Sequence, residues 1–174
     1  MFTNKDRNKI DHLKSSFNFS VLSSCGPEKY PDLSFISPML HLNWHVGHDF
    51  VDLCNDPENI DKIKYKLDLK LFIASLIRTK KVENIKINPY VSVLIAKVDS
   101  INSTCNLYLS IRGQARIYEG EDKEINLNKF FKHDNYSVQN YFRLDKEKET
   151  CLIIIESESF RLYNLWESVP ETGG

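Results

Sequence analysis

Hydrophobic and polar residues alternate along several segments of the chain with the two-residue period of a β-strand. The longest such pattern covers residues 107–118, where Leu107, Leu109 and Ile111 share one face and mostly polar residues share the other. Gly113 interrupts the apolar face and predicts a β-bulge or the close approach of another backbone. Similar alternation, or a continuous apolar run, predicts further strands at about 17–21, 32–40, 67–73, 91–98, 151–155 and 160–165.

Four segments have a helical pattern instead. Residues 4–14 precede the first strand, and residues 121–132 and 136–144 follow the longest one. The fourth helix is short, because Thr79 is a suitable N-cap and Pro89 excludes helical angles from the residue before it. The predicted elements are therefore mostly strands, with a few short helices between them.

The start of the short helix carries positive charge at the wrong end of the helix dipole. Lys80 and Lys81 lie in its first turn, where the partial positive charge of the backbone N–H groups disfavours a cation. A bound anion would remove this conflict, and Arg78 with the hydroxyls of Ser75 and Thr79 would complete a phosphate-binding turn. A solvated basic turn is the alternative that these residues leave open.

Two short motifs are informative, one leading into the hairpin predicted at 91–118 and one on its second strand. The first comprises Ser75, Thr79-Lys80-Lys81, Asn84-Ile85, Asn88-Pro89 and Val91-Ser92, and the second is Ile111-Arg112-Gly113-Gln114-Ala115. In this order they resemble the core of the pyridoxamine 5′-phosphate oxidase-like flavoproteins, over about residues 17–117. The resemblance implies a single domain, residues 1–174, that is β-rich and folded as an antiparallel split β-barrel with flanking short helices, of the FMN-binding split-barrel type.

The resemblance also implies a cofactor and a partner. Proteins of this family bind FMN in a cleft between two identical subunits, so a homodimer is expected. By position, phosphate contacts fall on the turn before the short helix. Flavin contacts fall on the strand at 32–40, on the longest strand, and on an aromatic residue that ends the last strand. The implied cofactor-binding residues are Ser34, Phe35, Ile36, Ser37, Ser75, Arg78, Thr79, Lys80, Lys81, Tyr108 and Trp166.

We therefore expect an FMN-dependent oxidoreductase or reductase, whose substrate and electron donor the sequence does not identify. No Ser-His-Asp set, acidic pair or glycine-rich nucleotide loop competes with this interpretation, and no catalytic residue is assigned. The Arg-x-His segment of true pyridoxamine phosphate oxidases has no match, so that substrate is not expected.

Two alternatives remain open. The family often has an arginine on the strand at 32–40 and a glutamine near position 108; this chain has neither, which favours a flavin-free dimeric binding module of the same fold. The strand Ser34-Phe-Ile-Ser-Pro38 and the histidine-containing segment after it favour a haem-binding or haem-degrading protein instead.

Histidines gather in the segment 41–65, which the resemblance marks as an insertion. His41 and His45 would lie one helical turn apart and could share a metal, with His48 or Asp49 as a third candidate ligand. Gly47 weakens the helix that would align their rings, so we expect a loop that covers the cleft and no metal site.

The composition fits a single folded domain. A net charge of −1 provides no general attraction to nucleic acid or to an anionic membrane, so neither partner is expected. No apolar run approaches the roughly 20 residues of a membrane span, and the N-terminus lacks an apolar signal segment, which predicts a cytoplasmic protein. The four cysteines lack Cys-x-x-Cys spacing and are expected as reduced thiols.

Overall fold

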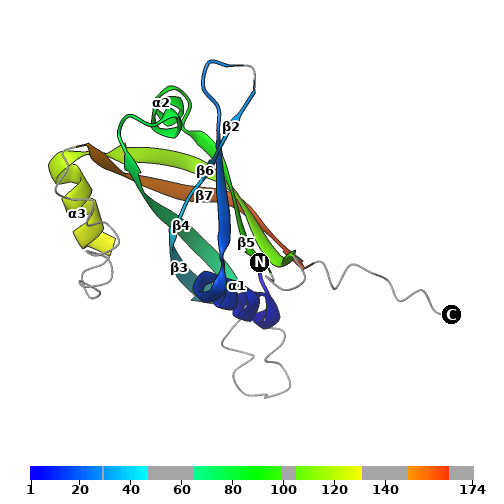
Figure 1. Cartoon of the computed structure of the whole chain (residues 1–174). Helices are drawn as coiled ribbons and strands as arrows, with labels where there is room; N and C mark the ends of the chain where they lie inside the picture. The colour runs from blue at the N-terminus through cyan, green and yellow to red at the C-terminus, as the bar shows by residue number, and fades with distance from the viewer. Residues whose placement is uncertain (29, 47–64, 99–104, 131–148, 165–174) are drawn as a thin grey trace.

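The structure is a computed structural model that describes residues 1–28, 30–46, 65–98, 105–130 and 149–164. In these residues, seven antiparallel strands form one sheet in the order β2-β1-β5-β6-β7-β4-β3 (Figure 1). Among the described residues, β2 and β3 are the two ends of this order and do not pair with each other, so the barrel is not closed. The strands are β1 (Phe19–Ser24), β2 (Asp32–Phe35), β3 (Met39–Val46), β4 (Tyr65–Leu76), β5 (Tyr90–Val98), β6 (Cys105–Tyr118) and β7 (Thr150–Asn164).

Within the described ranges, three helices accompany the sheet, namely α1 (Asn4–Ser16), α2 (Lys80–Ile87) and α3 (Gly120–Phe130). Figure 1 shows α1 and α2 at opposite ends of the sheet, with α3 to one side of it. No helix in the described part of the chain is both long enough and apolar enough to cross a membrane. The predicted helix at 136–144 lies outside the described residues.

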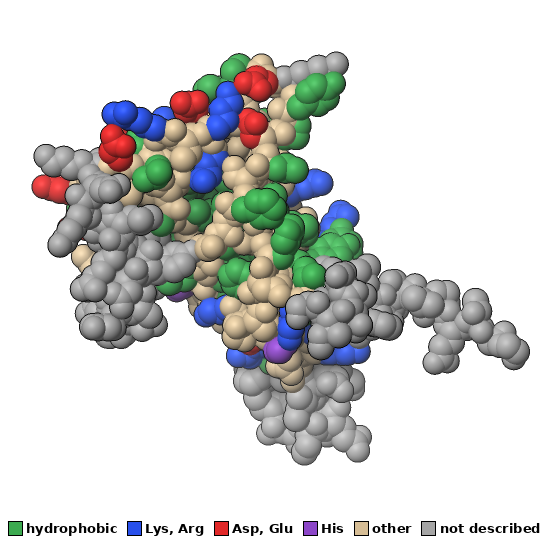
Figure 2. Space-filling view, viewed as in Figure 1, with side chains coloured by type: hydrophobic (Ala, Val, Ile, Leu, Met, Phe, Trp, Pro, Cys, Tyr) green, Lys and Arg blue, Asp and Glu red, His purple; other side chains and the backbone are tan. Residues whose placement is uncertain are grey.

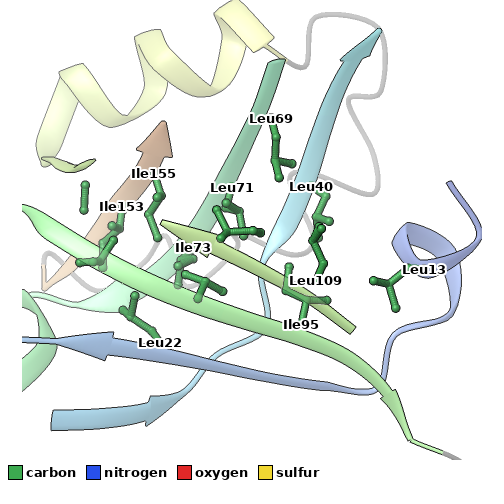
Figure 3. Packing of buried hydrophobic residues seen from close by; sticks show 14 of the residues in the cluster. Leu13, Leu22, Leu40, Leu69, Leu71, Ile73, Ile95, Leu109, Ile153 and Ile155 are labelled. Carbon is green, nitrogen blue, oxygen red and sulfur yellow. The ribbon is translucent and has the colours of Figure 1, made fainter. Parts of the chain in front are cut away.

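The main core fills the inner face of the curved sheet and is closed by two of the helices. Ile10 and Leu13 of α1 and Val82 and Ile85 of α2 are buried in the same cluster as the inward-facing residues of the strands. Figure 3 shows how these strands direct their aliphatic side chains into one interior. The labelled residues are Leu22, Leu40, Leu69, Leu71, Ile73, Ile95, Leu109, Ile153 and Ile155, with Leu13 from α1.

A second, smaller cluster lies on the outer face under α3. Phe72, Leu152 and Ile154 are buried there, and Leu127 and Phe130 of α3 pack against them. The predicted helix at 121–132 is therefore confirmed up to the last residue of α3. Its amphipathic face covers one part of the outer surface of the sheet.

The alternating pattern of the longest strand is confirmed. Leu109 and Ile111 of β6 are buried, whereas Arg112 and Arg116 are exposed. The register between β6 and β7 shifts at Gly113, and a Cβ at this position would overlap the carbonyl oxygen of Glu156. The glycine therefore permits a close backbone approach at a bulge, as the sequence predicts.

Two strand assignments were wrong in detail. The expected strand at 32–40 is divided into β2 and β3 around Ser37 and Pro38, because proline has no N–H to donate to a ladder. The two expected strands at 151–155 and 160–165 are one continuous strand, β7, because β6 offers a partner along the whole of it. The polar stretch that suggested a gap lies instead next to the bulge.

Candidate functional site

The turn between β4 and α2 is the centre of the candidate site. β4 ends at Leu76, and α2 begins at Lys80. The backbone N–H of Ile77 donates to the carbonyl oxygen of Glu149 at 2.7 Å, which attaches the turn to the chain entering β7. The buried strands on either side therefore fix the position of the first turn of α2.

Two hydroxyl groups meet inside this turn. The Oγ atoms of Ser75 and Thr79 lie 3.1 Å apart, and the Thr79 hydroxyl donates to the carbonyl oxygen of Leu76 at 3.0 Å. Thr79 occupies the N-cap position as predicted, but its side chain makes no capping bond to the helix because it is turned back toward β4. The N–H groups of Val82 and Glu83 donate to the carbonyl oxygen of Thr79 at 2.9 and 3.1 Å. Among the described residues, the N–H groups of Lys80 and Lys81 have no acceptor and no side-chain cap.

Two of the three predicted cations are paired with carboxylates. Lys80 Nζ lies 2.8 Å from Glu28 Oε1, in the turn between β1 and β2, and this hydrogen bond raises the pKa of Lys80. Arg78 Nη2 lies 3.2 Å from Glu149 Oε1. Figure 2 shows basic and acidic side chains intermixed at the end of the molecule that carries α2. Because both pairs are largely exposed, water screens them and each contributes little to stability.

Lys81 differs from its neighbours. Its side chain is partly buried, and within the described residues it forms no hydrogen bond or ion pair. Its charge acts on the thiol of Cys151, together with those of Lys86 and Lys123. It is therefore the cation of this turn that remains available to an external anion.

Cys151 is not a candidate nucleophile. It is buried, and this burial, followed by the negative charge of Glu119, raises the pKa of its thiol to about 11 despite the nearby lysines. The thiol therefore stays protonated at neutral pH, and a protonated thiol is a poor nucleophile.

The residues expected to contact the flavin ring lie on and just after β2. Ser34 and Phe35 belong to the strand, and Ile36 and Ser37 follow it before β3 begins. Phe35 is 79% exposed and packs edge-on against Phe19 at a centroid distance of 5.7 Å. The first residue of this strand, Asp32, contacts α2, so the structure brings the start of β2 to the candidate phosphate turn.

Tyr108 is not brought to this turn within one chain. It lies near the far end of β6, opposite Ala96 and Tyr163, and its ring stacks on that of Tyr163 at 4.6 Å. The turn lies beyond the other end, near Tyr118, and roughly 30 Å of extended strand separates Tyr108 from Tyr118. Trp166 lies outside the described residues.

The structure does not bring the histidines together either. His41 and His45 lie on strand β3, not on a helix, so the assumption that they are one helical turn apart was wrong. Four residues of strand separate them by roughly 13 Å. His45 Nε2 is 2.8 Å from Asp68 Oδ2, and no group of three potential metal ligands occurs among the described residues. His48 and Asp49, like most of the segment expected as an insertion, lie outside them.

His41 packs between aromatic rings at the edge of the cluster beneath α3. Its ring centroid lies 6.4 Å from that of Phe72 and 5.8 Å from that of Phe130. Partial burial lowers the pKa of His41, and the charges of Lys14 and Lys70 lower it further. The neutral ring is thus favoured in the folded protein.

Sequence reasoning did not find the carboxylates that pair with the cations of the turn. Glu28 lies 52 residues before Lys80, and no local pattern links the two. It also gave Asn84 no role beyond its place in a motif, although Asn84 is fully buried and bonds to Asp32. A fully buried asparagine on a short amphipathic helix is a structural signal that a sequence alone does not display.

No protein-family model and no curated protein sequence matches this chain, whereas many solved structures do. A candidate pyridoxamine 5′-phosphate oxidase from Listeria innocua is 23% identical, with a TM-score of 0.52 over 90% of this chain and 97% of that one. A protein related to general stress protein 26, of the pyridoxinephosphate oxidase family, from Clostridium acetobutylicum is 15% identical, with a TM-score of 0.55 over 92% and 89%. The heme storage protein HutZ from Vibrio cholerae is 12% identical, with a TM-score of 0.52 over 90% and 92%.

These likenesses define the fold. The described part of the chain forms one antiparallel sheet with three helices and folds as a split β-barrel of the pyridoxamine 5′-phosphate oxidase-like type. The fold implied by the two sequence motifs is therefore confirmed. Structures of this fold differ in what they bind, as the description of HutZ illustrates, so the function must be argued from the residues of this chain.

Proposed function

We propose that this protein binds FMN, with the phosphate held at the first turn of α2, and acts as a flavin-dependent oxidoreductase in the form of a homodimer. The observation that carries the proposal is the open helix start. The hydroxyls of Ser75 and Thr79 meet there, Thr79 leaves the helix uncapped, and Lys81 forms no ion pair within the described residues.

The donor set of the turn suits a phosphate monoester. Backbone N–H groups, two hydroxyls and a lysine ammonium are all hydrogen-bond donors, and the helix dipole adds partial positive charge. Lys80 and Arg78 can exchange their exposed carboxylate partners for a phosphate at little cost, because screened ion pairs are weak. The residues present therefore fit the phosphate of FMN.

The chemistry itself would come from the flavin, which transfers hydride or single electrons when bound. The role of this chain is to bind and orient. Lys81 and the hydroxyls would hold the phosphate, while β2 and the segment 36–37 would lie along the ring. Buried strands on both sides of the turn keep these groups in place before the cofactor arrives.

The partner that we propose is a second copy, docked on the outer face of the sheet. Directly paired residues of neighbouring strands share a face, so Phe35, Val21 and Leu94 form one row across β2, β1 and β5. Tyr108 and Tyr163 continue a neighbouring row on β6 and β7. Figure 2 shows hydrophobic side chains extending down this side of the molecule from the tip of the β1–β2 hairpin.

Such a surface is typical of an interface, because exposed aromatic and aliphatic side chains stabilise association when they are buried. A dimer also resolves the position of Tyr108. Since this residue is far from the phosphate turn of its own chain, any flavin contact that it makes would be with a cofactor held by the other subunit.

Replacement of Lys81 by alanine tests the cofactor assignment. A charge-assisted bond to phosphate contributes about 1.5–3 kcal/mol, so Lys81→Ala should weaken FMN binding by about tenfold or more. Riboflavin has no phosphate and should bind nearly as before. Isothermal titration or quenching of flavin fluorescence gives both affinities.

Lys86→Ala is the matched control for this test. Lys86 lies on the same helix, but its ammonium is 3.0 Å from Glu119 near the other end, so its loss should leave FMN binding unchanged. Equal losses of FMN and riboflavin in Lys81→Ala, or equal effects of the two lysine variants, would refute the phosphate assignment.

Sedimentation tests the dimer. At micromolar concentration the protein should have twice the chain mass, and Leu94→Asp should produce monomers because it places a charge in the proposed interface. Ile125→Asp is the control, since Ile125 is an exposed hydrophobic residue on α3. A flavin-loaded monomer of the unaltered protein would overturn the shared-cleft arrangement.

One observation favours a flavin-free binding module as a second candidate. The Lys80–Glu28 and Arg78–Glu149 pairs satisfy two cations of the turn without any ligand. The visible absorption spectrum of the purified protein separates the candidates, because bound flavin, bound haem and an empty site absorb differently. A flavin spectrum supports the main proposal, and a Soret band would move the function to haem binding.

A further inference from the structure

A buried side chain of α2 joins the helix to the hairpin formed by β1 and β2. Asn84 is fully buried, and its Nδ2 donates to Asp32 Oδ2 at 2.6 Å and to Ser24 Oγ at 3.3 Å. Ser24 is the last residue of β1 and Asp32 is the first of β2, so this one amide group bonds to both ends of the connecting turn. The short distance to a carboxylate marks the Asp32 bond as the stronger of the two.

The other half of the same amide has an unusual environment. Asn84 Oδ1 is the one buried side-chain polar atom in the described part of the chain that has no hydrogen-bond partner. It faces Gly26, where any Cβ would overlap it. The turn therefore closes over the amide only because residue 26 is glycine. Burying Oδ1 without a hydrogen bond destabilises the folded protein, so the presence of Asn84 here indicates a role for the two bonds that its Nδ2 makes.

What the amide holds is a weakly attached strand. β2 has four residues, lies at the edge of the sheet and pairs with β1 alone among the described strands. Beyond its last residue, Ile36 is bonded to Ser20 through both its N–H and its carbonyl group. At the first residue, Asp32 pairs with Ser24 of β1, and its bond to Asn84 joins this end of the strand to α2, supported at the surface by the Lys80–Glu28 pair.

We propose that Asn84 is a positioning residue that fixes β2 relative to the first turn of α2, and so couples the two halves of the candidate FMN site. This inference rests on the proposed function, in which the turn binds the phosphate and β2 lies along the ring. FMN must contact both halves at once, so its affinity depends on their relative position. Riboflavin contacts only the ring half, and inorganic phosphate contacts only the turn.

Loss of this positioning should change the three ligand affinities in a different pattern from loss of a direct phosphate contact. Asn84→Ala should weaken FMN by about tenfold, as expected when a charge-assisted bond is lost, and leave inorganic phosphate and riboflavin nearly unchanged. Lys81→Ala should instead weaken both FMN and inorganic phosphate. Asn88→Ala is the matched control, because Asn88 ends the same helix and its side chain accepts only the N–H of Tyr90.

Backbone hydrogen exchange tests the coupling without any cofactor. In Asn84→Ala, the amides of β2 should exchange about tenfold faster than in the unaltered protein, while those of β6 should not change. Unchanged exchange in β2 would overturn the positioning role, whether or not the protein binds flavin. If the unaltered protein binds no FMN, the proposed function fails, and the exchange result alone decides the role of Asn84.

Asn84→Asp provides a reversible form of the same test and guards against a variant that fails to fold. Above neutral pH, carboxylates at positions 84 and 32 would repel each other and release the strand. At lower pH, a pair of carboxyl groups this close shares one proton and forms a hydrogen bond again. The FMN affinity and the β2 exchange rates of Asn84→Asp, each relative to the unaltered protein at the same pH, should therefore recover as the pH falls from 8 to about 5. Absence of recovery in a folded variant would contradict the proposal.

Discussion

The two helices α1 and α2 both follow a threonine, but their first turns are built differently. In α1, Thr3 Oγ1 accepts the N–H of Asp6 at 3.2 Å, and the Asp6 carboxylate accepts the N–H of Thr3 at 3.0 Å. This capping box closes the helix start and places an acid at its positive end. In α2, Thr79 makes no capping bond, and the first two helical residues are Lys80 and Lys81.

The start of α1 is therefore capped by side chains of its own chain, whereas the start of α2 has no side-chain cap. In the first turn of α1, the chain itself supplies a side-chain cap for the N–H of Asp6 and a carboxylate that complements the helix dipole. In the first turn of α2, no side chain caps the helix, and Lys80 and Lys81 come before the acidic Glu83. A bound anion would complement both the uncapped N–H groups and the two lysines. Packing of Val82 and Ile85 into the core holds α2 in place in spite of this start.

The largest expected effect comes from making α2 resemble α1. Thr79→Asp places a carboxylate at the N-cap, where it would repel a phosphate, and FMN affinity should fall by well over tenfold. The same change should raise the free energy of unfolding of the cofactor-free protein by about 0.5–1 kcal/mol, because it caps the helix and suits its dipole.

Flavin titration and urea unfolding measure these two effects. Thr79→Ser keeps the hydroxyl and serves as the control, with nearly unchanged FMN binding. A Thr79→Asp variant that binds FMN as tightly as the unaltered protein would show that the helix start is not the phosphate site.

Replacement of each N-cap threonine by alanine should change stability by a smaller amount. Thr3→Ala breaks the capping box and should lower the free energy of unfolding by about 1 kcal/mol. Thr79→Ala has no capping bond to lose and should cost less than about half as much. Equal losses in urea unfolding would mean that the two threonines have the same structural role and would remove the contrast on which the site assignment rests.

The smallest expected effect is a pH dependence that arises from His41 of β3. Burial, Lys14 and Lys70 lower the pKa of His41 in the folded protein below its usual value of 6.5. The unfolded chain therefore binds the proton more readily, so stability declines as the pH falls below about 6.5 and levels off below the folded-state pKa. His41→Gln should flatten thermal unfolding midpoints measured between pH 7 and 5, without altering FMN affinity at pH 7.5. An unchanged slope would assign the dependence to other groups.

Local patterns in the sequence predicted much of the fold. The alternation in β6, the bulge at Gly113 and the limits of α2 follow from residue spacing, from the missing Cβ of glycine and from Pro89, all of which act over a few residues. Ser75 and Thr79, which the sequence assigns to one turn, have their Oγ atoms 3.1 Å apart, and their role in binding phosphate stays a prediction.

Features that depend on distant partners could not be predicted in this way. The continuity of β7 requires β6 beside it, and the strand character of residues 41–46 requires β4. The carboxylates that pair with Lys80 and Arg78, and the two bonds of Asn84, join segments that only the folded sheet brings together. The direction of the Thr79 hydroxyl also escaped prediction, because the carbonyl oxygen of Leu76 competes with the helix for it.

A side-by-side titration of the unaltered protein with FMN and with riboflavin tests the central claim most directly. The two ligands differ only in the phosphate group, so the ratio of their dissociation constants isolates the contribution of the first turn of α2. If that turn binds phosphate through Lys81 and its open N–H groups, FMN should bind at least about tenfold more tightly than riboflavin. Equal affinities for the two ligands, or no binding of either, would contradict the account.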